Sequence, residues 1–201
     1  MNMKGRTALI TGATGGLGQH MAETIAELGG RVVLIDRPGS DYTPLTSRLH
    51  QYGTEVFCID CDLESEDERK QLITEVNEQF LSIDVLINNA AFVGTTDLSG
   101  WITSFEEQEI GTWRRAIEVN LTAAFDLSKS LLPLLKESGK GSIINIASIY
   151  GVSGPIHSMY KGTEMGNPAA YSVSKGGLIQ LTRWLSTTIA PEVRLNAVSP
   201  G

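Results

Sequence analysis

The stretch Thr11-Gly12-Ala13-Thr14-Gly15-Gly16-Leu17-Gly18 decides the fold, because it joins an apolar run to an amphipathic segment near the start of the chain. Residues 6–11 have the composition of a buried strand, and the residues after the turn have the spacing of a helix. Glycines let a backbone turn sharply and approach a pyrophosphate, while the following helix offers free N–H groups and the positive end of its dipole. Ordinary tight turns also use glycine, but this position between strand and helix favours a nucleotide-binding turn.

The rest of the chain repeats the alternation of strand and helix. Further strands are predicted at residues 31–36, 55–60, 84–88, 142–147 and 193–198. Most of these runs are continuously apolar, as expected of parallel strands that are covered on both faces. Strand, helix and strand in alternation call for right-handed crossovers. We therefore predict an α/β protein with a doubly wound parallel sheet, a three-layer Rossmann fold in which residues 1–201 form a single domain.

Helix starts are visible in several of the connecting segments. Ser65 and Glu68 form a predicted capping box, in which each side chain satisfies a backbone N–H of the other residue. A cap followed by proline marks two more starts, at Thr43-Pro44 and at Asn167-Pro168. Residues 112–136 predict a long helix that bends near its proline.

The composition excludes several classes of protein. The 201 residues carry 16 Lys and Arg against 23 Asp and Glu, a net charge of −7 that argues against nucleic acid or an anionic membrane as a partner. Hydrophobic residues make up 41%, which is ordinary for a globular protein. No apolar run approaches the roughly 20 residues that span a bilayer, and the first residues lack the apolar region of a signal peptide. We expect a cytoplasmic protein with no nucleic-acid or membrane partner.

The two cysteines, Cys58 and Cys61, form a C-x-x-C pair. Such a pair can be a redox site or half of a zinc site. The sequence supplies neither a second cysteine pair nor a nearby histidine to complete four ligands. In an extended strand the two sulfurs would lie about 10 Å apart, too far for a disulfide. We predict unpaired thiols at the end of a strand and no metal site.

Asp36 ends the second predicted strand, 18 residues beyond Gly18. A carboxylate at this place can accept hydrogen bonds from the adenosine ribose hydroxyls of a dinucleotide, and it would repel a 2′-phosphate. Arg37 follows and could hold such a phosphate, so the two residues compete. Because nothing basic lies in the glycine turn, we predict NAD as the preferred cofactor and keep NADP as the alternative.

Tyr171 and Lys175 are four residues apart, which places them one turn apart on one face of a predicted helix. A tyrosine normally has a pKa near 10. A neighbouring ammonium stabilises the phenolate and lowers that pKa, which makes the pair a usable general acid and base. The spacing alone is common in helices, so the pair gains weight only from the motifs around it.

Taken in order, the motifs resemble those of the short-chain dehydrogenase/reductase family, in its compact single-domain branch. The glycine turn has the spacing of that branch, and Asn88-Asn89-Ala90-Ala91 resembles the family's Asn-Asn-Ala-Gly with alanine in the last place. Asp62-Leu63 resembles the family's adenine-contacting motif, and Pro200-Gly201 the Pro-Gly beside the nicotinamide. The resemblance covers essentially the whole chain. It implies that the cofactor is bound by Gly12, Thr14, Gly15, Gly16, Leu17, Gly18, Asp36, Arg37, Asp62, Leu63, Asn89, Ala90, Ala91, Tyr171, Lys175, Pro200 and Gly201.

The resemblance also implies an oxidoreductase that transfers a hydride between a nicotinamide cofactor and a secondary alcohol or ketone. In that family's pattern Tyr171 is the general acid and base, Lys175 lowers its pKa and binds the ribose, and Ser148 orients the substrate oxygen. Asn120 matches the asparagine of the proton relay, in which it positions a water. The alternative is a non-catalytic NAD(P)-binding sensor on the same fold. A sugar epimerase or dehydratase is disfavoured by the glycine spacing.

Two features depart from the family's pattern. Ser148 and Tyr171 are 23 positions apart, a longer separation than the family usually has. We expect the extra segment, residues 154–165, to lie over the active site, where His157, Tyr160 and Lys161 would contact a polar, sugar-like or phosphorylated substrate; a solvated loop is the other interpretation. The family also continues beyond the position of Gly201, so we expect the working protein to be longer, with a further strand and a substrate lid.

The resemblance predicts the oligomer as well. Residues 112–136 and 168–190 would form the dimerising helices of the family, although their apolar positions could equally belong to the core. We expect a homodimer or homotetramer that acts on a small-molecule substrate.

Overall fold

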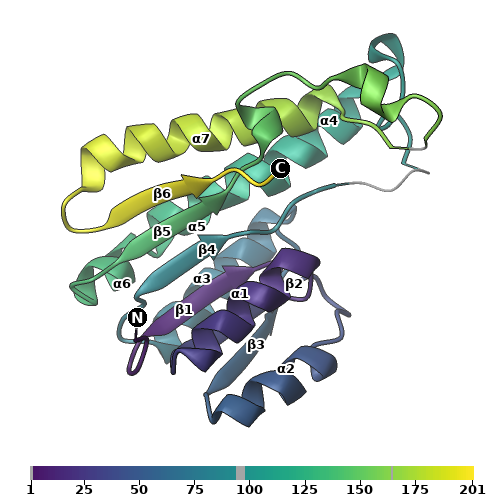
Figure 1. The fold of residues 1–201 in the computed structure, drawn as a ribbon. Helices are drawn as coiled ribbons and strands as arrows, with labels where there is room; N and C mark the ends of the chain where they lie inside the picture. The colour runs from purple at the N-terminus through teal and green to yellow at the C-terminus, as the bar shows by residue number, and fades with distance from the viewer. Residues whose placement is uncertain (1, 94–97, 164) are drawn as a thin grey trace.

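A computed structural model of the chain describes residues 2–93, 98–163 and 165–201. Six parallel strands form one sheet in the order β3-β2-β1-β4-β5-β6 (Figure 1). Each predicted strand is confirmed to within one residue at either end. Their bounds are Thr7–Thr11 for β1, Arg31–Asp36 for β2, Val56–Asp60 for β3, Val85–Asn88 for β4, Ser142–Ile146 for β5 and Arg194–Val198 for β6.

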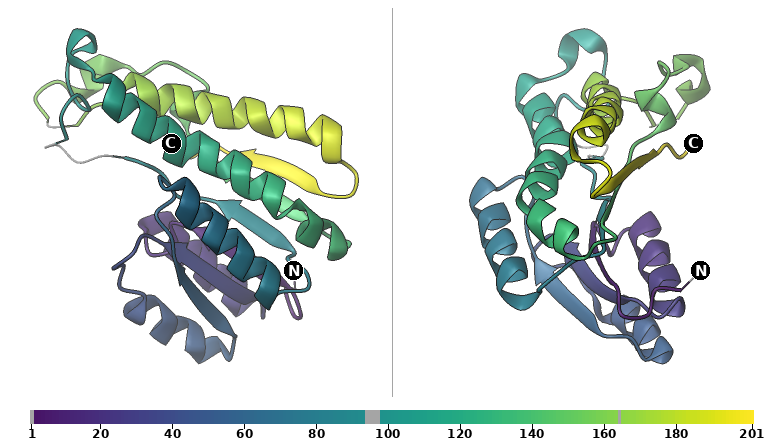
Figure 2. Two further views of the ribbon diagram at one scale, coloured as in Figure 1. Left: turned by 180° about the vertical axis from the view of Figure 1, so that it is seen from behind. Right: turned by 90° about the vertical axis from the view of Figure 1, so that its left-hand side faces the viewer.

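The helices form two layers, one on each face of the sheet (Figures 1 and 2). Helices α1 and α2 pack on one face of β1, β2 and β4, while α3, α5, α6 and α7 pack on the opposite face. The doubly wound three-layer fold is therefore confirmed. The helices are α1 (Gly16–Glu27), α2 (Thr43–Leu49), α3 (Glu66–Gln79), α4 (Ile110–Ile117), α5 (Ala123–Ser130), α6 (Leu132–Glu137) and α7 (Ala169–Ile189).

Short helical turns complete the chain, and one of them interrupts the long predicted helix. That helix extends from α4 to α6, but the π-helical turn η3 (Glu118–Thr122) separates α4 from α5, and the break before α6 lies at Leu131. The 3-10 turns are η1 (His50–Tyr52), η2 (Phe105–Glu107), η4 (Ile149–Gly151) and η5 (His157–Tyr160). In the described part of the chain, no helix is long and apolar enough to cross a membrane.

The predicted helix starts are partly wrong. Ser65 caps α3 by accepting a hydrogen bond from the Glu68 N–H at 3.3 Å, as predicted. The Glu68 carboxylate, however, accepts from the backbone N–H of Asp62 at 2.6 Å instead of returning to Ser65. Thr43 is already the first residue of α2, and Pro168 occupies the N-cap position of α7 that was predicted for Asn167. The Asn167 side chain instead accepts a hydrogen bond from the Ser172 hydroxyl at 2.8 Å.

The cysteines are free thiols in different surroundings: Cys58 is exposed in β3, and Cys61 is buried just after it. Burial raises the pKa of Cys61 to about 12, so this thiol stays protonated at neutral pH.

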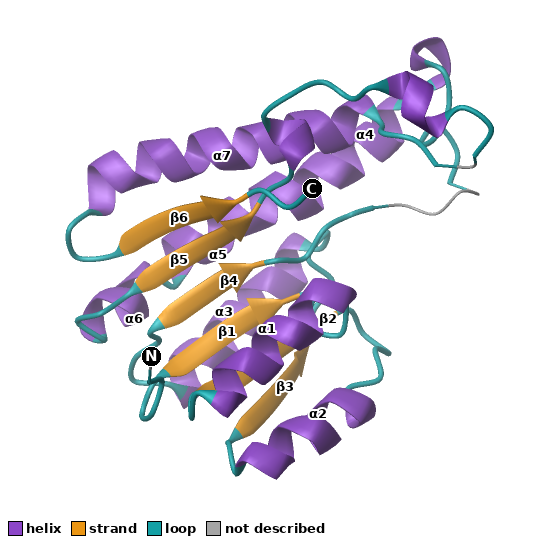
Figure 3. Ribbon diagram, viewed as in Figure 1, coloured by secondary structure: helices purple, strands orange, loops and turns teal. Residues whose placement is uncertain are grey.

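The carboxyl ends of the six strands lie at one edge of the sheet, and the two long connections, from β4 to α4 and from β5 to α7, are both at that edge (Figure 3). Open α/β sheets bind ligands at this edge, because the chain leaves neighbouring strands in opposite directions there. In this sheet the change of direction is at β1 and β4, which are neighbours although β2 and β3 separate them in sequence. The candidate site therefore starts at β1 and β4.

Candidate active site

The glycine turn after β1 approaches the end of β4 so closely that side chains are excluded. Gly12 has a φ of +63°, and a Cβ atom there would lie 2.8 Å from the Cα of Ala90. A Cβ atom on Gly18 would overlap the carbonyl oxygen of Gly12. Gly16, in contrast, has open space where a side chain would be, at the first residue of α1. Gly12 and Gly18 therefore allow close packing of the backbone around the turn, while the space at Gly16 leaves room for a ligand.

Hydrogen bonds to the residues after β4 fix this turn. The Asn89 amide nitrogen donates to the carbonyl oxygens of Thr11 at 3.0 Å and of Gly12 at 2.9 Å. The Thr11 hydroxyl accepts from the backbone N–H groups of Asn89 and Ala90 at 3.1 and 3.0 Å. No described residue other than glycine has a positive φ, so Ala91 replaces the family's glycine without strain.

Asp36 lies across from the turn and is bonded to it. Its Oδ2 accepts hydrogen bonds from the Thr14 N–H at 2.8 Å and from the Thr14 hydroxyl at 2.7 Å. Its Oδ1 accepts from the N–H of Arg37 at 2.8 Å. The carboxylate therefore already has a fixed position, and a ribose hydroxyl would share it with Thr14.

A cavity of about 630 Å³ opens between the glycine turn, the ends of β2 and β3, and α4. We call it the nucleotide cavity. The predicted residues that line it are Gly12, Thr14, Gly15, Gly16, Leu17, Asp36, Arg37, Asp62, Leu63, Asn89, Ala90 and Ala91. Gly18 packs beneath the turn, and Tyr171, Lys175, Pro200 and Gly201 are not among the lining residues. A helix N-terminus, a glycine-rich turn and a carboxylate at a strand end together fit a dinucleotide.

Sequence reasoning missed several residues at the α4 side of this cavity. Arg115 donates to both carboxylate oxygens of Glu64 at 2.9 and 3.0 Å, and its guanidinium lies 4.9 Å from the ring centre of Phe92. All three residues line the cavity. They come from three segments far apart in sequence. The only sequence signal for Glu64 and Phe92 is that they follow β3 and β4, and Arg115 in α4 has no such signal.

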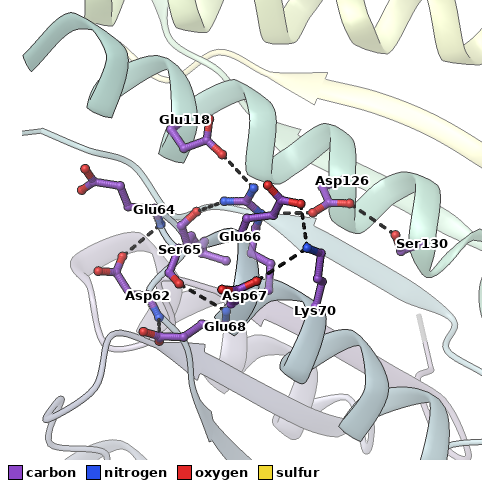
Figure 4. A network of polar contacts seen from close by, with 12 residues as sticks. Asp62, Glu64, Ser65, Glu66, Asp67, Glu68, Lys70, Glu118, Asp126 and Ser130 are labelled. Carbon is purple, nitrogen blue, oxygen red and sulfur yellow. Dashed lines mark hydrogen bonds and ion pairs between the residues drawn. The ribbon is translucent and has the colours of Figure 1, made fainter. Parts of the chain in front are cut away.

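Behind the Asp62-Leu63 turn, a buried arginine holds α3 against η3 and α5 in the same helix layer. Arg69, 2% exposed, donates to the carbonyl oxygen of Leu63 at 2.5 Å and pairs with Glu118 and Asp126 at 2.7 and 3.1 Å. Figure 4 shows Glu118 and Asp126 reaching this network from the helix above the capping segment of α3. The arginine therefore fixes the predicted adenine-contacting turn relative to the π-helical turn.

Lys175 lies on α7 beneath Tyr171 and is almost fully buried. Its side chain is 2% exposed, and its Nζ donates to the carbonyl oxygen of Ile146 at 2.7 Å. The Nζ atom is 5.8 Å from the ring centre of Tyr171. Desolvation lowers the pKa of Lys175 to about 8. The predicted pairing of ammonium and phenol on one helix face is thus present, with a lysine that can exchange protons near neutral pH.

Ser148 follows β5 and is the N-cap residue of η4. It is 7% exposed, and its hydroxyl accepts a hydrogen bond from the Tyr150 N–H at 3.2 Å at the start of η4. The next residue, Ile149, donates its N–H to the carbonyl oxygen of Pro200 at 3.0 Å, which places Pro200 beside this strand end. A Cβ atom on Gly151 would lie 2.7 Å from the backbone of Lys175, so η4 packs directly on α7.

Asn120 lies in the π-helical turn and is 2% exposed. Its Oδ1 accepts from the Phe92 N–H at 2.5 Å, and its Nδ2 donates to the Ser174 hydroxyl at 3.0 Å. Both ends of the amide are therefore occupied in holding the segment after β4 against α7. A π-helical turn at this residue is a common sign of a functional position.

The segment between Ser148 and Tyr171 folds over the start of α7. The Tyr160 hydroxyl is hydrogen-bonded to the Tyr150 hydroxyl. His157 and Tyr160 line a second cavity of about 600 Å³ between this segment and residues 101–108, which we call the loop cavity. Lys161, the third predicted substrate residue, is exposed and does not line it.

Comparison with known proteins agrees with this geometry. The family model described as short chain dehydrogenase matches residues 6–201. A 3-oxoacyl-(acyl-carrier-protein) reductase of rhamnolipid biosynthesis from Pseudomonas aeruginosa is 32% identical over 206 residues, which cover all of this chain and 73% of that enzyme. A cis-4-hydroxycyclohexanecarboxylate dehydrogenase from Sinomonas cyclohexanicum is 32% identical over 198 residues, covering 98% of this chain and 72% of the relative.

Solved structures show the same fold. The complex of Pseudomonas aeruginosa RhlG with NADP superimposes with a TM-score of 0.83 at 32% identity, over all of this chain and 73% of the other. A xylitol dehydrogenase with bound NAD⁺ superimposes with a TM-score of 0.85 at 30% identity, over all of this chain and 72% of the other.

Proposed function

The chain belongs to the short-chain dehydrogenase family, and on that premise we propose that it is an NAD(P)-dependent oxidoreductase that interconverts a secondary alcohol and a ketone. The observation that carries the proposal is the buried Lys175 ammonium beside Tyr171, hydrogen-bonded to Ile146 at the end of β5, two residues before Ser148. Burying a lysine ammonium lowers the free energy of unfolding, and titratable groups with such strongly perturbed pKa values are typical of functional sites.

The residues of the chain would manage the proton and the substrate oxygen. When bound, the nicotinamide would accept or donate the hydride. The Ser148 hydroxyl would hold the substrate oxygen by a hydrogen bond. Tyr171 would give or take the hydroxyl proton, and the neighbouring ammonium of Lys175 would stabilise the phenolate that forms. One N–H of the Lys175 ammonium donates to the Ile146 carbonyl oxygen. The others would donate hydrogen bonds to the ribose of the nicotinamide.

Asn120 would act in this scheme by position. Its amide joins Phe92 to Ser174, and Ser174 immediately precedes Lys175 on α7. It therefore supports the proposed relay through the geometry of Lys175, and a water held near the π-helical turn would complete the path to solvent.

For the cofactor, we propose NAD in preference to NADP. The Asp36 carboxylate lines the nucleotide cavity where a ribose is expected and would repel a 2′-phosphate. Arg37 lines the same cavity and favours NADP, the second candidate. The solved relatives include complexes with NADP or NADPH as well as a complex with NAD⁺.

We further propose a homo-oligomer through α4, α5 and α7. Large apolar side chains on these helices face solvent in the single chain: Ile110 is 63% exposed, Phe125 44% and Trp184 57%. Exposed apolar side chains on adjoining helices are typical of an interface.

The test is to assay a panel of secondary alcohols and ketones with each cofactor. Turnover is measured by the change in absorbance of the reduced nicotinamide. Tyr171→Phe should lower kcat by about 10²- to 10⁴-fold, as expected for loss of a general acid and base. The variant should still bind the cofactor, as measured by tryptophan fluorescence. Tyr52→Phe, on the exposed turn η1, is the matched control and should keep full activity. Undiminished turnover in Tyr171→Phe would exclude the proton donor. Cofactor binding without turnover of any compound would favour the non-catalytic sensor.

A further inference from the structure

The loop cavity is formed where two segments far apart in sequence are packed together. Gly166 has no side chain, and a Cβ atom there would lie 2.6 Å from the Cγ2 of Ile102. The Gln108 side chain accepts a hydrogen bond from the Ala169 N–H at 3.1 Å. The segment before α7 is therefore docked on the connection between β4 and α4, and the cavity lies between two contacting walls.

The cavity adjoins the proposed reaction centre. Pro168 and Ser172 line it, and they lie within one turn of Tyr171 at the start of α7. Tyr160 also lines it, and its hydroxyl contacts Tyr150, whose N–H donates to the Ser148 hydroxyl. A substrate whose oxygen reaches Ser148 and Tyr171 could thus extend toward the loop cavity past Tyr160.

The lining carries no fixed charge among the residues that the structure describes. None of these is lysine, arginine, aspartate or glutamate, and the residues outside the description, 1, 94–97 and 164, include no lysine or arginine in the sequence. Apolar side chains project from both walls: Phe105 is 78% exposed, Met165 67% and Val173 50%. Ser104, His157 and Asn167 supply polar atoms between them.

This combination selects against anions. A carboxylate or phosphate that enters the cavity loses part of its hydration and meets no lysine or arginine among the described lining residues. An uncharged group with apolar surface instead covers the exposed apolar side chains. Lys161, the one cation of the inserted segment, lies outside the cavity.

We propose that the loop cavity binds the part of the substrate remote from the reacting carbon, and that this part is uncharged and partly apolar. The inference rests on the proposed oxidoreductase function. It narrows the expected substrate, because a phosphorylated or carboxylated group is disfavoured, and it makes Tyr160 and His157 specificity-determining residues in place of Lys161.

A matched pair of probes tests this: methyl 4-oxocyclohexanecarboxylate and the free 4-oxocyclohexanecarboxylate, which differ in charge at the end remote from the ketone. With the full chain and saturating cofactor at pH 8, above the range where histidines usually titrate, we expect the ester to have at least about a tenfold lower Kd and higher kcat/KM. Binding is measured by quenching of tryptophan fluorescence, since Trp101 lines the cavity, and turnover by absorbance.

Three variants sharpen the result. His157→Arg places a fixed cation on the cavity wall and should reduce the preference for the ester several-fold. Tyr160→Phe should raise the KM of the ester with little change in cofactor Kd. Lys161→Ala, adjacent but outside the cavity, should leave the preference unchanged.

The outcomes separate this inference from the proposed function. Equal or tighter binding of the carboxylate, binding of neither probe, or no response to His157→Arg would overturn the inference. Binding of the ester without turnover of any compound would instead count against the proposed reaction and leave the cavity assignment standing.

Discussion

The nucleotide cavity and the loop cavity lie at the same edge of the sheet but are built differently. The nucleotide cavity is formed by strand ends and a glycine turn. Hydrogen bonds from the Asn89 side chain to Gly12 and from the Thr14 N–H to Asp36 fix its walls. The loop cavity is formed by two long connections that meet through Gly166 and Gln108. The sheet therefore imposes one site, whereas the other depends on how two loops pack.

This difference separates the two tasks of the enzyme. A rigid cradle suits a cofactor that is common to a whole family, and loops on a rigid scaffold are where binding specificity varies. Lys175 lies between the two regions, bonded to the end of β5 and beneath the tyrosine at the start of α7. The predictions below test this division, from the largest expected effect to the smallest.

The largest effect is expected at the junction of the two regions, as a pH dependence of stability. Burial lowers the pKa of Lys175 from 10.5 to about 8, so between these values the unfolded chain binds more protons than the folded protein. The cost of the buried ammonium is fully present below about pH 8 and disappears as the pH rises toward 10.5. Between neutral pH and pH 10, the free energy of unfolding of the parent should therefore rise relative to Lys175→Met by up to about 3 kcal/mol.

Urea denaturation of both proteins at several pH values measures this difference. Lys161→Met, which changes an exposed lysine, is the matched control and should follow the parent at every pH. Parallel curves for the parent and Lys175→Met would contradict the lowered pKa.

The second prediction compares one glycine from each region. Gly12→Ala places a Cβ atom 2.8 Å from the Cα of Ala90 at a φ of +63°, so it should lower the free energy of unfolding by about 2 kcal/mol and weaken cofactor binding. Gly154→Ala, in the inserted segment, meets nothing within 4 Å and should change stability by less than about 0.5 kcal/mol. Equal effects of the two substitutions, by denaturation and cofactor titration, would remove the contrast between a fixed cradle and a tolerant loop.

The smallest predicted effect concerns the choice of cofactor. Asp36→Asn removes a negative charge where a 2′-phosphate would lie, and we expect the ratio of NADP to NAD affinity to rise about tenfold. Calorimetric titration with each cofactor gives the ratio, and Asp41→Asn, in the exposed turn before α2, is the control. An unchanged ratio would mean that Asp36 serves only to hold Thr14.

Much of the nucleotide cavity could be predicted from the sequence, because its motifs are short and follow strands. Each strand end brings its next residues to the same edge, so Asp36, Asp62 and Asn89 could be placed together without further information. The ion pair of Arg115 with Glu64 could not, since it joins a helix to a turn 51 residues away.

Errors in the predicted helix starts have the same origin. Glu68 and Asn167 were expected to satisfy local N–H groups, but the Asp62 backbone and the Ser172 hydroxyl compete for them. Local capping patterns do not include such competitors. The π-helical turn at Asn120 was also missed, because its amide is held by Phe92 and Ser174 from other segments.

The sequence by itself determined the alternation of strands and helices, the glycine turn, the acidic strand end and the spacing of Tyr171 and Lys175. These features depend on residues within one or two turns of each other, where backbone geometry allows few arrangements. Only the tertiary structure decided that Lys175 is desolvated and that Asn120 holds Phe92 against α7. It also decided that the described residues of the inserted segment line a cavity without a lysine, arginine, aspartate or glutamate, while Lys161 stays outside it. These properties come from the packing of segments far apart in the chain, and packing is decided by shape and burial that no short pattern contains.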